Sequence, residues 1–155
     1  MKGFTLIEIL VAVSILIIGI VGLYLALPRI FESFYFSKDY FIASYLGQEG
    51  MELVRNIRDG NWLKDDSWDN GLSAGDYQIA YNDSSLFVYQ NTFLYLKDGY
   101  YCYNLEGVQT KFKRKITIST LAEGENKISV RAIVSWPEKG VIKNYEVQEN
   151  LYDWK

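Results

Sequence analysis

A single carboxylate lies within the apolar N-terminal stretch of this chain, and its chemistry needs an explanation. Glu8 is the only charged residue between Phe4 and Leu27. A charged side chain at bilayer depth is costly on insertion scales, so such a residue usually has a partner. Snorkelling of the Glu8 carboxylate to the near membrane surface is the alternative explanation. The sequence therefore predicts a partner for Glu8.

Few other residues could carry chemistry. The chain has no histidine, which removes Ser-His-Asp and Cys-His catalysis and the commonest metal ligand. Cys102 is the only cysteine, so neither an intrachain disulfide nor a cysteine-based zinc site can form. We interpret Cys102, within GYYCYN, as a small buried hydrophobe. Pairing with another chain and a reactive thiol are the alternatives.

The acidic residues outside the N-terminal stretch do not indicate a site. Asp65, Asp66 and Asp69 could suggest calcium, but their spacing does not match an EF-hand loop. Turn chemistry explains them. Glu123 and Glu125 fall in the turn sequence AEGEN, where we expect them to be solvated. The sequence thus predicts no catalytic residues, no metal and no cofactor, and we do not expect an enzyme.

Composition indicates a folded, aromatic-rich chain rather than a nucleic-acid binder. The 155 residues have a formal net charge of −3, and the 16 lysines and arginines are scattered. Without a basic stripe, nucleic-acid binding is not evident. The 13 tyrosines and 4 tryptophans exceed what a disordered chain carries.

The stretch from Phe4 to Leu27 has the length of a membrane-spanning helix. At ~1.5 Å per residue it would span about 36 Å, enough for a hydrocarbon core of ~30 Å. It fits a secretory signal peptide poorly, because Lys2 is the only positive residue ahead of it, the run is too long, and no A-x-A site follows. We therefore predict a transmembrane helix over residues 4–27.

The sequence KGFTLIEILVAVSILIIGIVGL joins three features: a short basic leader that ends in Gly3, Phe4 after it, and Glu8 four residues further on. This pattern resembles the signal of type IV prepilins and pseudopilins. The resemblance implies that a membrane-embedded prepilin peptidase removes a leader of residues 1–3 by cutting between Gly3 and Phe4. The same enzyme then methylates the new amine of Phe4. That amine is the partner implied for Glu8, and the pair would act in subunit assembly.

Three residues near the end of the apolar stretch weaken a helix. They are Gly19, Gly22 and Pro28. The resemblance implies that this segment loosens when subunits pack into a filament. Ordinary tolerance of glycine and proline in membrane helices is the alternative. Pilins often have a proline about three residues earlier, where this chain has Leu25.

Residues 28–60 are predicted to continue the helix with one apolar face, because apolar or small residues recur at helical spacing. The predicted face comprises Ile42, Leu46, Gly50, Leu53 and Ile57. Gly47 and Gly50 would let another element approach closely. Gly60 is predicted to cap the end of the helix.

Residues 61–155 are predicted to form an antiparallel β-sheet head. Apolar residues alternate in several segments, such as KISVRAIVSW, and Asp98 followed by Gly99 indicates a hairpin. Consecutive strands with short turns indicate a meander. The fold class is therefore α+β and pilin-like: a long N-terminal helix, membrane-spanning in its first half, packs on this head.

The resemblance implies a structural subunit, of the minor-pilin type, of a type IV pilus or related pseudopilus. Its partners would be the prepilin peptidase/methyltransferase, other pilin subunits, the assembly machinery and the cytoplasmic membrane. It would be a single-pass membrane protein with its head outside the cytoplasm before assembly. Alternatives are a pseudopilin of type II secretion or DNA uptake, and a membrane-anchored binding module with Tyr100, Tyr101 and Tyr103 as a ligand platform.

Overall fold

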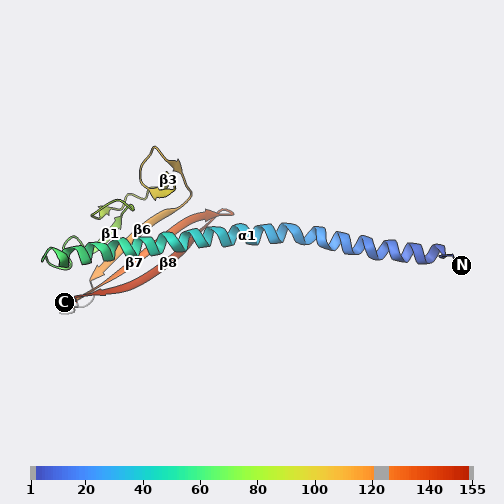
Figure 1. The fold of residues 1–155 in the computed structure, drawn as a ribbon, viewed down its shortest axis with the longest axis horizontal. Helices are drawn as coiled ribbons and strands as arrows, with labels where there is room; N and C mark the ends of the chain where they lie inside the picture. Colours follow the sequence, from blue (N-terminus) through green and yellow to red (C-terminus); the bar gives the residue numbers. More distant parts are fainter. Residues whose placement is uncertain (1–2, 121–125, 154–155) are drawn as a thin grey trace. The chain divides into compact units, whose positions relative to one another are not determined.

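The structure is a computed structural model that describes residues 3–120 and 126–153. The chain divides into two compact units, Met1–Asp39 and Tyr40–Lys155. Helix α1 (Leu6–Leu63) supplies the regular structure of the first unit, and its last part belongs to the second (Figure 1). There it packs on an antiparallel sheet, so the predicted α+β, pilin-like fold class is confirmed. The division falls inside the predicted segment 28–60.

Within the second unit, one face of α1 is buried against the sheet. The residues buried on this face follow the spacing of an amphipathic helix. They are Ala43, Leu46, Gly47, Gly50, Met51 and Val54. The predicted face therefore overlaps the observed one, but the observed face is rotated slightly about the helix axis. Ile42, Leu53 and Ile57 lie at its margins and are only partly buried.

The end of α1 differs from the prediction. The helix continues past Gly60 to Leu63, and Asp65 adopts the left-handed conformation with φ of 55°. The N–H of Asp66 donates to the carbonyl oxygen of Asn61 at 3.0 Å. An aspartate can adopt the left-handed conformation that usually ends a helix. The prediction that Gly60 caps the helix is therefore wrong, and Asp65 takes the left-handed position instead.

Five strands form the larger sheet of the second unit. They are β1 (Gly75–Gln78), β2 (Phe87–Val88), β6 (Lys113–Thr120), β7 (Lys127–Glu138) and β8 (Val141–Tyr152). Their spatial order is β2-β1-β6-β7-β8, and all neighbours are antiparallel. On β7 the predicted alternation is confirmed, because the inward side chains are Ile128, Val130, Ala132, Val134 and Trp136, all buried.

Three short strands form a second sheet, in the order β4-β3-β5. They are β3 (Tyr95–Lys97), β4 (Tyr100–Cys102) and β5 (Val108–Gln109). The predicted hairpin is confirmed: Asp98 and Gly99 have φ of 51° and 86°, as a type I′ turn requires. The prediction of a single meander is wrong, because β6, β7 and β8 are the only three consecutive strands, among those described, that lie side by side in chain order. The turn-forming sequence YNDSS lies between β1 and β2, and after β2 the chain leaves the larger sheet until β6.

Two glycines let α1 approach the larger sheet closely, as predicted. A Cβ atom added at Gly50 would lie 2.8 Å from Cδ1 of Ile116 and 3.1 Å from Cδ of Arg114. One added at Gly47 would lie 3.1 Å from Cε1 of Tyr145. Contacts below about 3.4 Å are unusually tight for a Cβ atom, so side chains at these positions would force the helix or its neighbours to move.

Candidate processing and assembly site

The predicted cleavage bond lies in non-helical chain ahead of α1. Residues 3–5 have no regular structure and are exposed, and the Phe4 side chain is 84% accessible. A Cβ atom added at Gly3 would meet nothing within 4 Å. Met1 and Lys2 of the predicted leader lie outside the described residues. The Gly3–Phe4 bond is therefore exposed within the residues that the structure describes, and its cleavage stays a prediction.

Glu8 and Thr5 together form a capping box at the start of α1. The Glu8 Oε2 atom accepts hydrogen bonds from the backbone N–H and the hydroxyl of Thr5, both at 2.9 Å. In return, the N–H of Glu8 donates to the Thr5 hydroxyl oxygen at 3.4 Å. Reciprocal bonds of this kind satisfy backbone donors that a helix start leaves free.

The capping box was readable in the sequence and was missed. Thr5 followed three residues later by Glu8, directly before an apolar run, is the known pattern for this motif. Glu8 therefore has a partner within its own chain, in addition to the Phe4 amine that the resemblance implies. Glu8 Oε1 accepts no hydrogen bond from the residues that the structure describes, so this oxygen is open to a further donor.

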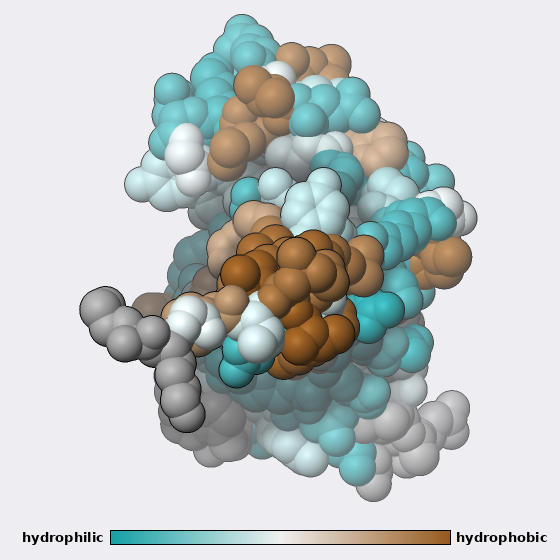
Figure 2. All heavy atoms as spheres, turned by 90° about the vertical axis from the view of Figure 1, so that its right-hand side faces the viewer, coloured by the Kyte–Doolittle hydropathy of each residue, from teal (hydrophilic) through white to brown (hydrophobic). Residues whose placement is uncertain are grey.

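The N-terminal part of α1 presents a largely apolar surface. Within the described ranges, α1 is the one helix long and apolar enough to cross a membrane, by length and composition, and its apolar window is fully exposed. The surface of this segment is mostly brown in Figure 2. The Ser14 hydroxyl donates to the carbonyl oxygen of Leu10 at 2.7 Å, so this polar group is satisfied inside the helix.

The three predicted helix-loosening residues lie in continuous helix. α1 runs without a break through Gly19, Gly22 and Pro28. Cβ atoms added at both glycines would meet nothing within 4 Å. Proline has no N–H to donate to the carbonyl four residues back, which here belongs to Tyr24. Loosening of this segment on assembly stays a prediction.

The tyrosines considered as a ligand platform differ in exposure. Tyr100 stacks on Tyr81, with ring centroids 4.6 Å apart. Tyr101 packs edge-on against Phe112 at 6.4 Å. The Tyr103 hydroxyl donates to the carbonyl oxygen of Arg114 at 3.1 Å. Two of the three tyrosines thus pack against the core, and Tyr100 alone is well exposed.

Cys102 and the loop aspartates behave as the sequence indicated. Cys102 is buried, with its sulfur 3.6 Å from the carbonyl oxygen of Tyr95. In the loop after α1, the Ser67 hydroxyl donates to Asp69, and the Asn70 side chain donates to Asp66 at 3.1 Å. These are local turn bonds. Glu123 and Glu125 lie outside the described residues.

A buried arginine connects α1 to the larger sheet, and sequence reasoning missed it. The Arg114 side chain is 0% exposed and donates to Glu49 at 2.6 Å and to the carbonyl oxygen of Leu46 at 3.0 Å. It also donates to the carbonyl oxygen of Ile79 at 2.6 Å. Alternation along β6 places residue 114 on the same face as Phe112 and Ile116, so the sequence indicated that Arg114 points inward. It was missed because only apolar residues were used to define that face.

Comparison with known families supports the N-terminal interpretation. Residues 1–24 match the family model of the prokaryotic N-terminal methylation motif, the signal of type IV pilins and pseudopilins. Neither the curated proteins nor the solved structures include a significant match to the chain. The chain therefore carries the processing signal of a type IV pilin-like or pseudopilin-like precursor.

Proposed function

We propose that this chain is a structural subunit, of the minor type, of a type IV pilus or related pseudopilus, and not an enzyme. The observation that carries the proposal is the arrangement of residues 3–8. An exposed Gly3–Phe4 bond precedes a capped helix whose Glu8 has one carboxylate oxygen, Oε1, that accepts no hydrogen bond from the described residues. The methylation motif and the exposed apolar helix that follows support the same conclusion.

Cleavage creates a cation next to this carboxylate. Hydrolysis between Gly3 and Phe4 leaves the α-amine of Phe4 as the new N-terminus, and the peptidase then adds a methyl group to it. Glu8 Oε1 accepts a hydrogen bond from this amine, on the same or a neighbouring subunit, while Oε2 still accepts its bonds from Thr5. Pairing two charges at the edge of an apolar phase lowers the cost of each. Glu8 thereby sets the position of one subunit against the next.

The apolar helix has two successive environments in this proposal. It first anchors the precursor in the cytoplasmic membrane as a single span, with the head outside the cytoplasm. The assembly machinery then moves it into a filament, where other pilin subunits replace the lipid. Gly19, Gly22 and Pro28 let the segment loosen during this change, because each lowers the stability of regular helix.

Mass spectrometry tests the processing step. The full-length gene is expressed in cells with and without a prepilin peptidase, and the intact mass of the membrane protein is measured. We expect loss of Met1 to Gly3 and gain of one methyl group only when the peptidase is present. Gly3→Leu should leave the precursor uncut, whereas Gly60→Leu, remote from the bond, should not affect cutting. Full-length protein alone in peptidase-containing cells would contradict the proposal.

Two alternatives remain distinguishable by experiment. A pseudopilin of type II secretion or DNA uptake would share the whole N-terminal site, and the machine that co-purifies with the processed protein identifies it. A membrane-anchored binding module would retain Met1 to Gly3. The packing of Tyr101 and Tyr103 against the core favours the subunit over this module.

A further inference from the structure

Strand β8 forms a long open edge of the larger sheet. Of the strands in the described ranges, only β7 pairs with it, through twelve consecutive residue pairs without a bulge (Figure 1). Proteins commonly protect such an edge with charged side chains, proline, a bulge or a covering element, because its free backbone groups bind other strands. Of these, β8 carries charged side chains, on Lys143, Glu146 and Glu149. β8 contains no proline and no bulge. Its edge is therefore able to accept another strand.

The hydrogen-bond pattern shows which backbone groups of β8 are free. The N–H of Asp153 donates to the carbonyl oxygen of Asn126 at 3.0 Å, one position beyond the pair of Lys127 with Tyr152. Bonded and non-bonded pairs alternate in an antiparallel ladder, so Tyr152 and every second residue before it turn their N–H and C=O groups away from β7. Pro137, which has no N–H, pairs with Ile142 at such a non-bonded position, as this pattern requires. The free row comprises Ile142, Asn144, Glu146, Gln148, Asn150 and Tyr152.

A groove lies next to this edge, between α1 and β8. Its volume is about 530 Å³, and Tyr45, Met51 and Val147 supply its apolar lining. Val147 is on the inward face of β8, which faces α1. Alternate side chains of a strand point to the same face. A strand bound at the β8 edge would therefore direct every second side chain into the groove.

The charges of the groove select the side chains of that strand. Three carboxylates line it, from Glu49, Glu52 and Glu149. Arg55 is the one cation in the lining, and it pairs with Glu52 at 2.7 Å and also with Glu149. Glu49 pairs with the buried Arg114. Acidic groups thus outnumber basic groups at the accessible rim, and the groove favours a strand with a basic residue among apolar ones.

We propose that the β8 edge binds an extended peptide strand of another protein by strand addition. The backbone of the added strand bonds to the free row, as in other β-augmented complexes. Its apolar side chains contact Tyr45, Met51 and Val147, and a lysine or arginine contacts the carboxylates at the rim. The inference concerns residues 40–155 alone and does not depend on processing or assembly through the N-terminal helix.

Hydrogen exchange with a defined probe tests this proposal. The probe is a short capped peptide in which threonines alternate with valine, lysine and valine, added to full-length protein in detergent. We expect the amides of Asn144, Glu146 and Gln148 to exchange more slowly with the peptide, whereas Tyr145 and Val147 are already protected by β7. A peptide N-methylated at its edge-facing amides should give no protection. Replacing the probe's lysine by glutamate should weaken binding roughly three- to fivefold, the size of an exposed charge effect.

Three variants of the protein test the same edge with an unchanged peptide. Asn144→Pro removes one free N–H from the edge and leaves the β7 ladder intact, since proline is tolerated at outward positions of edge strands. Asn144→Ala keeps the N–H and is the matched control, and Asn150→Pro repeats the test if Asn144→Pro fails to fold. We expect the proline variants to lose peptide binding and the alanine variant to retain it.

Three outcomes would overturn the proposal. The first is an absence of peptide protection at the free row of β8. The second is equal peptide binding by the proline and alanine variants. The third is concentration-dependent protection of Asn144 and Gln148 without peptide, because this would show that two copies of the chain pair through β8. None of these outcomes bears on cleavage between Gly3 and Phe4, so the proposed function is tested separately.

Discussion

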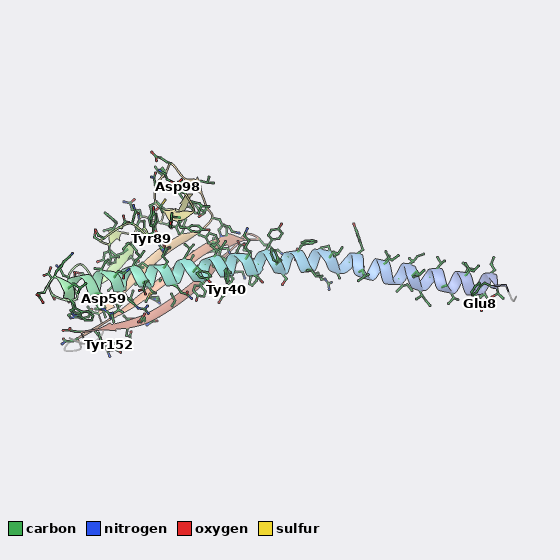
Figure 3. The ribbon with its side chains drawn as sticks, viewed as in Figure 1. Glu8, Tyr40, Asp59, Tyr89, Asp98 and Tyr152 are labelled. Atoms are coloured by element: carbon green, nitrogen blue, oxygen red, sulfur yellow. The ribbon has the colours of Figure 1, made fainter. Side chains whose placement is uncertain are left out.

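The Glu8 carboxylate accepts two hydrogen bonds from Thr5 through one oxygen, Oε2, and both measure 2.9 Å. Glu8 lies at the N-terminal end of α1 in Figure 3. The residue therefore acts within its own chain as a helix cap before any partner binds. A substitution at Glu8 would remove the cap and the proposed amine partner together. The two roles are separated by comparing Glu8 with Thr5.

The first prediction separates capping from pairing. Thr5→Ala removes the hydroxyl of the cap but keeps the carboxylate, and losing a cap costs about 1 kcal/mol. We expect this variant to enter filaments nearly as well as wild type. Glu8→Val should be cleaved and inserted normally, but its incorporation should fall below about a tenth of wild type, because it leaves the Phe4 amine without its partner. Glu8→Asp, with a shorter reach, should be intermediate.

Filament shearing measures this difference. Each variant is expressed, filaments are sheared from the cells, and the processed protein is compared between the filament and membrane fractions. Equal losses for Thr5→Ala and Glu8→Val would mean that capping accounts for the whole effect. Wild-type incorporation of Glu8→Val would leave the carboxylate without a role in assembly.

The second prediction uses two glycines of one helix. Gly50→Leu overfills the contact with Ile116 and Arg114 and should lower the free energy of unfolding by about 1–3 kcal/mol. At Gly60, a Cβ atom meets nothing within 4 Å, so Gly60→Leu should raise stability by up to about 1 kcal/mol through helix propensity. Thermal unfolding followed by circular dichroism in detergent gives both values. A destabilised Gly60→Leu variant would show that propensity does not limit this end of α1.

The third prediction compares a buried arginine with an exposed one. Arg114→Ala removes three hydrogen bonds from a side chain that is 0% exposed and leaves Glu49 without its cation. We expect a loss of about 3 kcal/mol or more in the free energy of unfolding. The control, Arg131→Ala, breaks an exposed pair with Glu146 at 3.5 Å and should cost at most about 1 kcal/mol. Denaturant titration distinguishes them, and equal costs would contradict the role assigned to Arg114.

The fourth prediction concerns alkaline pH. Burial raises the pKa of Tyr103 from 10.0 to about 12. Between these values the unfolded state loses the proton while the folded state keeps it, so the stability contribution is complete below pH 10 and is lost as pH rises toward 12. The loss amounts to roughly 2–3 kcal/mol.

Variants of two tyrosines isolate this effect. Tyr103→Phe cannot ionise and should show a smaller loss of stability between about pH 9 and about pH 12 than wild type does. Tyr100→Phe replaces an exposed ring and should retain the wild-type loss. Urea titrations at both pH values provide the comparison. An unchanged alkaline loss in Tyr103→Phe would assign the pH dependence to other groups.

Much of the fold was predictable because it follows from local patterns. The alternation in β7 identified every inward side chain of that strand. The dipeptide Asp98-Gly99 predicted the turn, whose positive φ angles the structure confirms. The apolar N-terminal helix follows from composition alone. These features depend on neighbours in sequence, so the sequence carries them directly.

The remaining features depend on distant contacts. β2 and β5 have two residues each, too few for a periodic pattern, so their pairing could not be predicted. Arg114 was missed because an inward arginine is stabilised by Glu49 and two carbonyl groups far away in sequence. In the candidate site, Gly3, Phe4 and Glu8 were recognised from the motif, whereas the capping role of Thr5 was missed although its spacing from Glu8 is a local pattern.

The tight approach at Gly50 also has an evolutionary consequence. Since a Cβ atom there would lie 2.8 Å from Cδ1 of Ile116, the volumes of these two side chains are coupled. A homologue with alanine or serine at position 50 should compensate with a shorter residue, such as valine, at position 116. Substitutions at the two sites should therefore covary across homologues, and size at one should be inversely correlated with size at the other. Gly60, which lies on the same helix without such a neighbour, should vary independently.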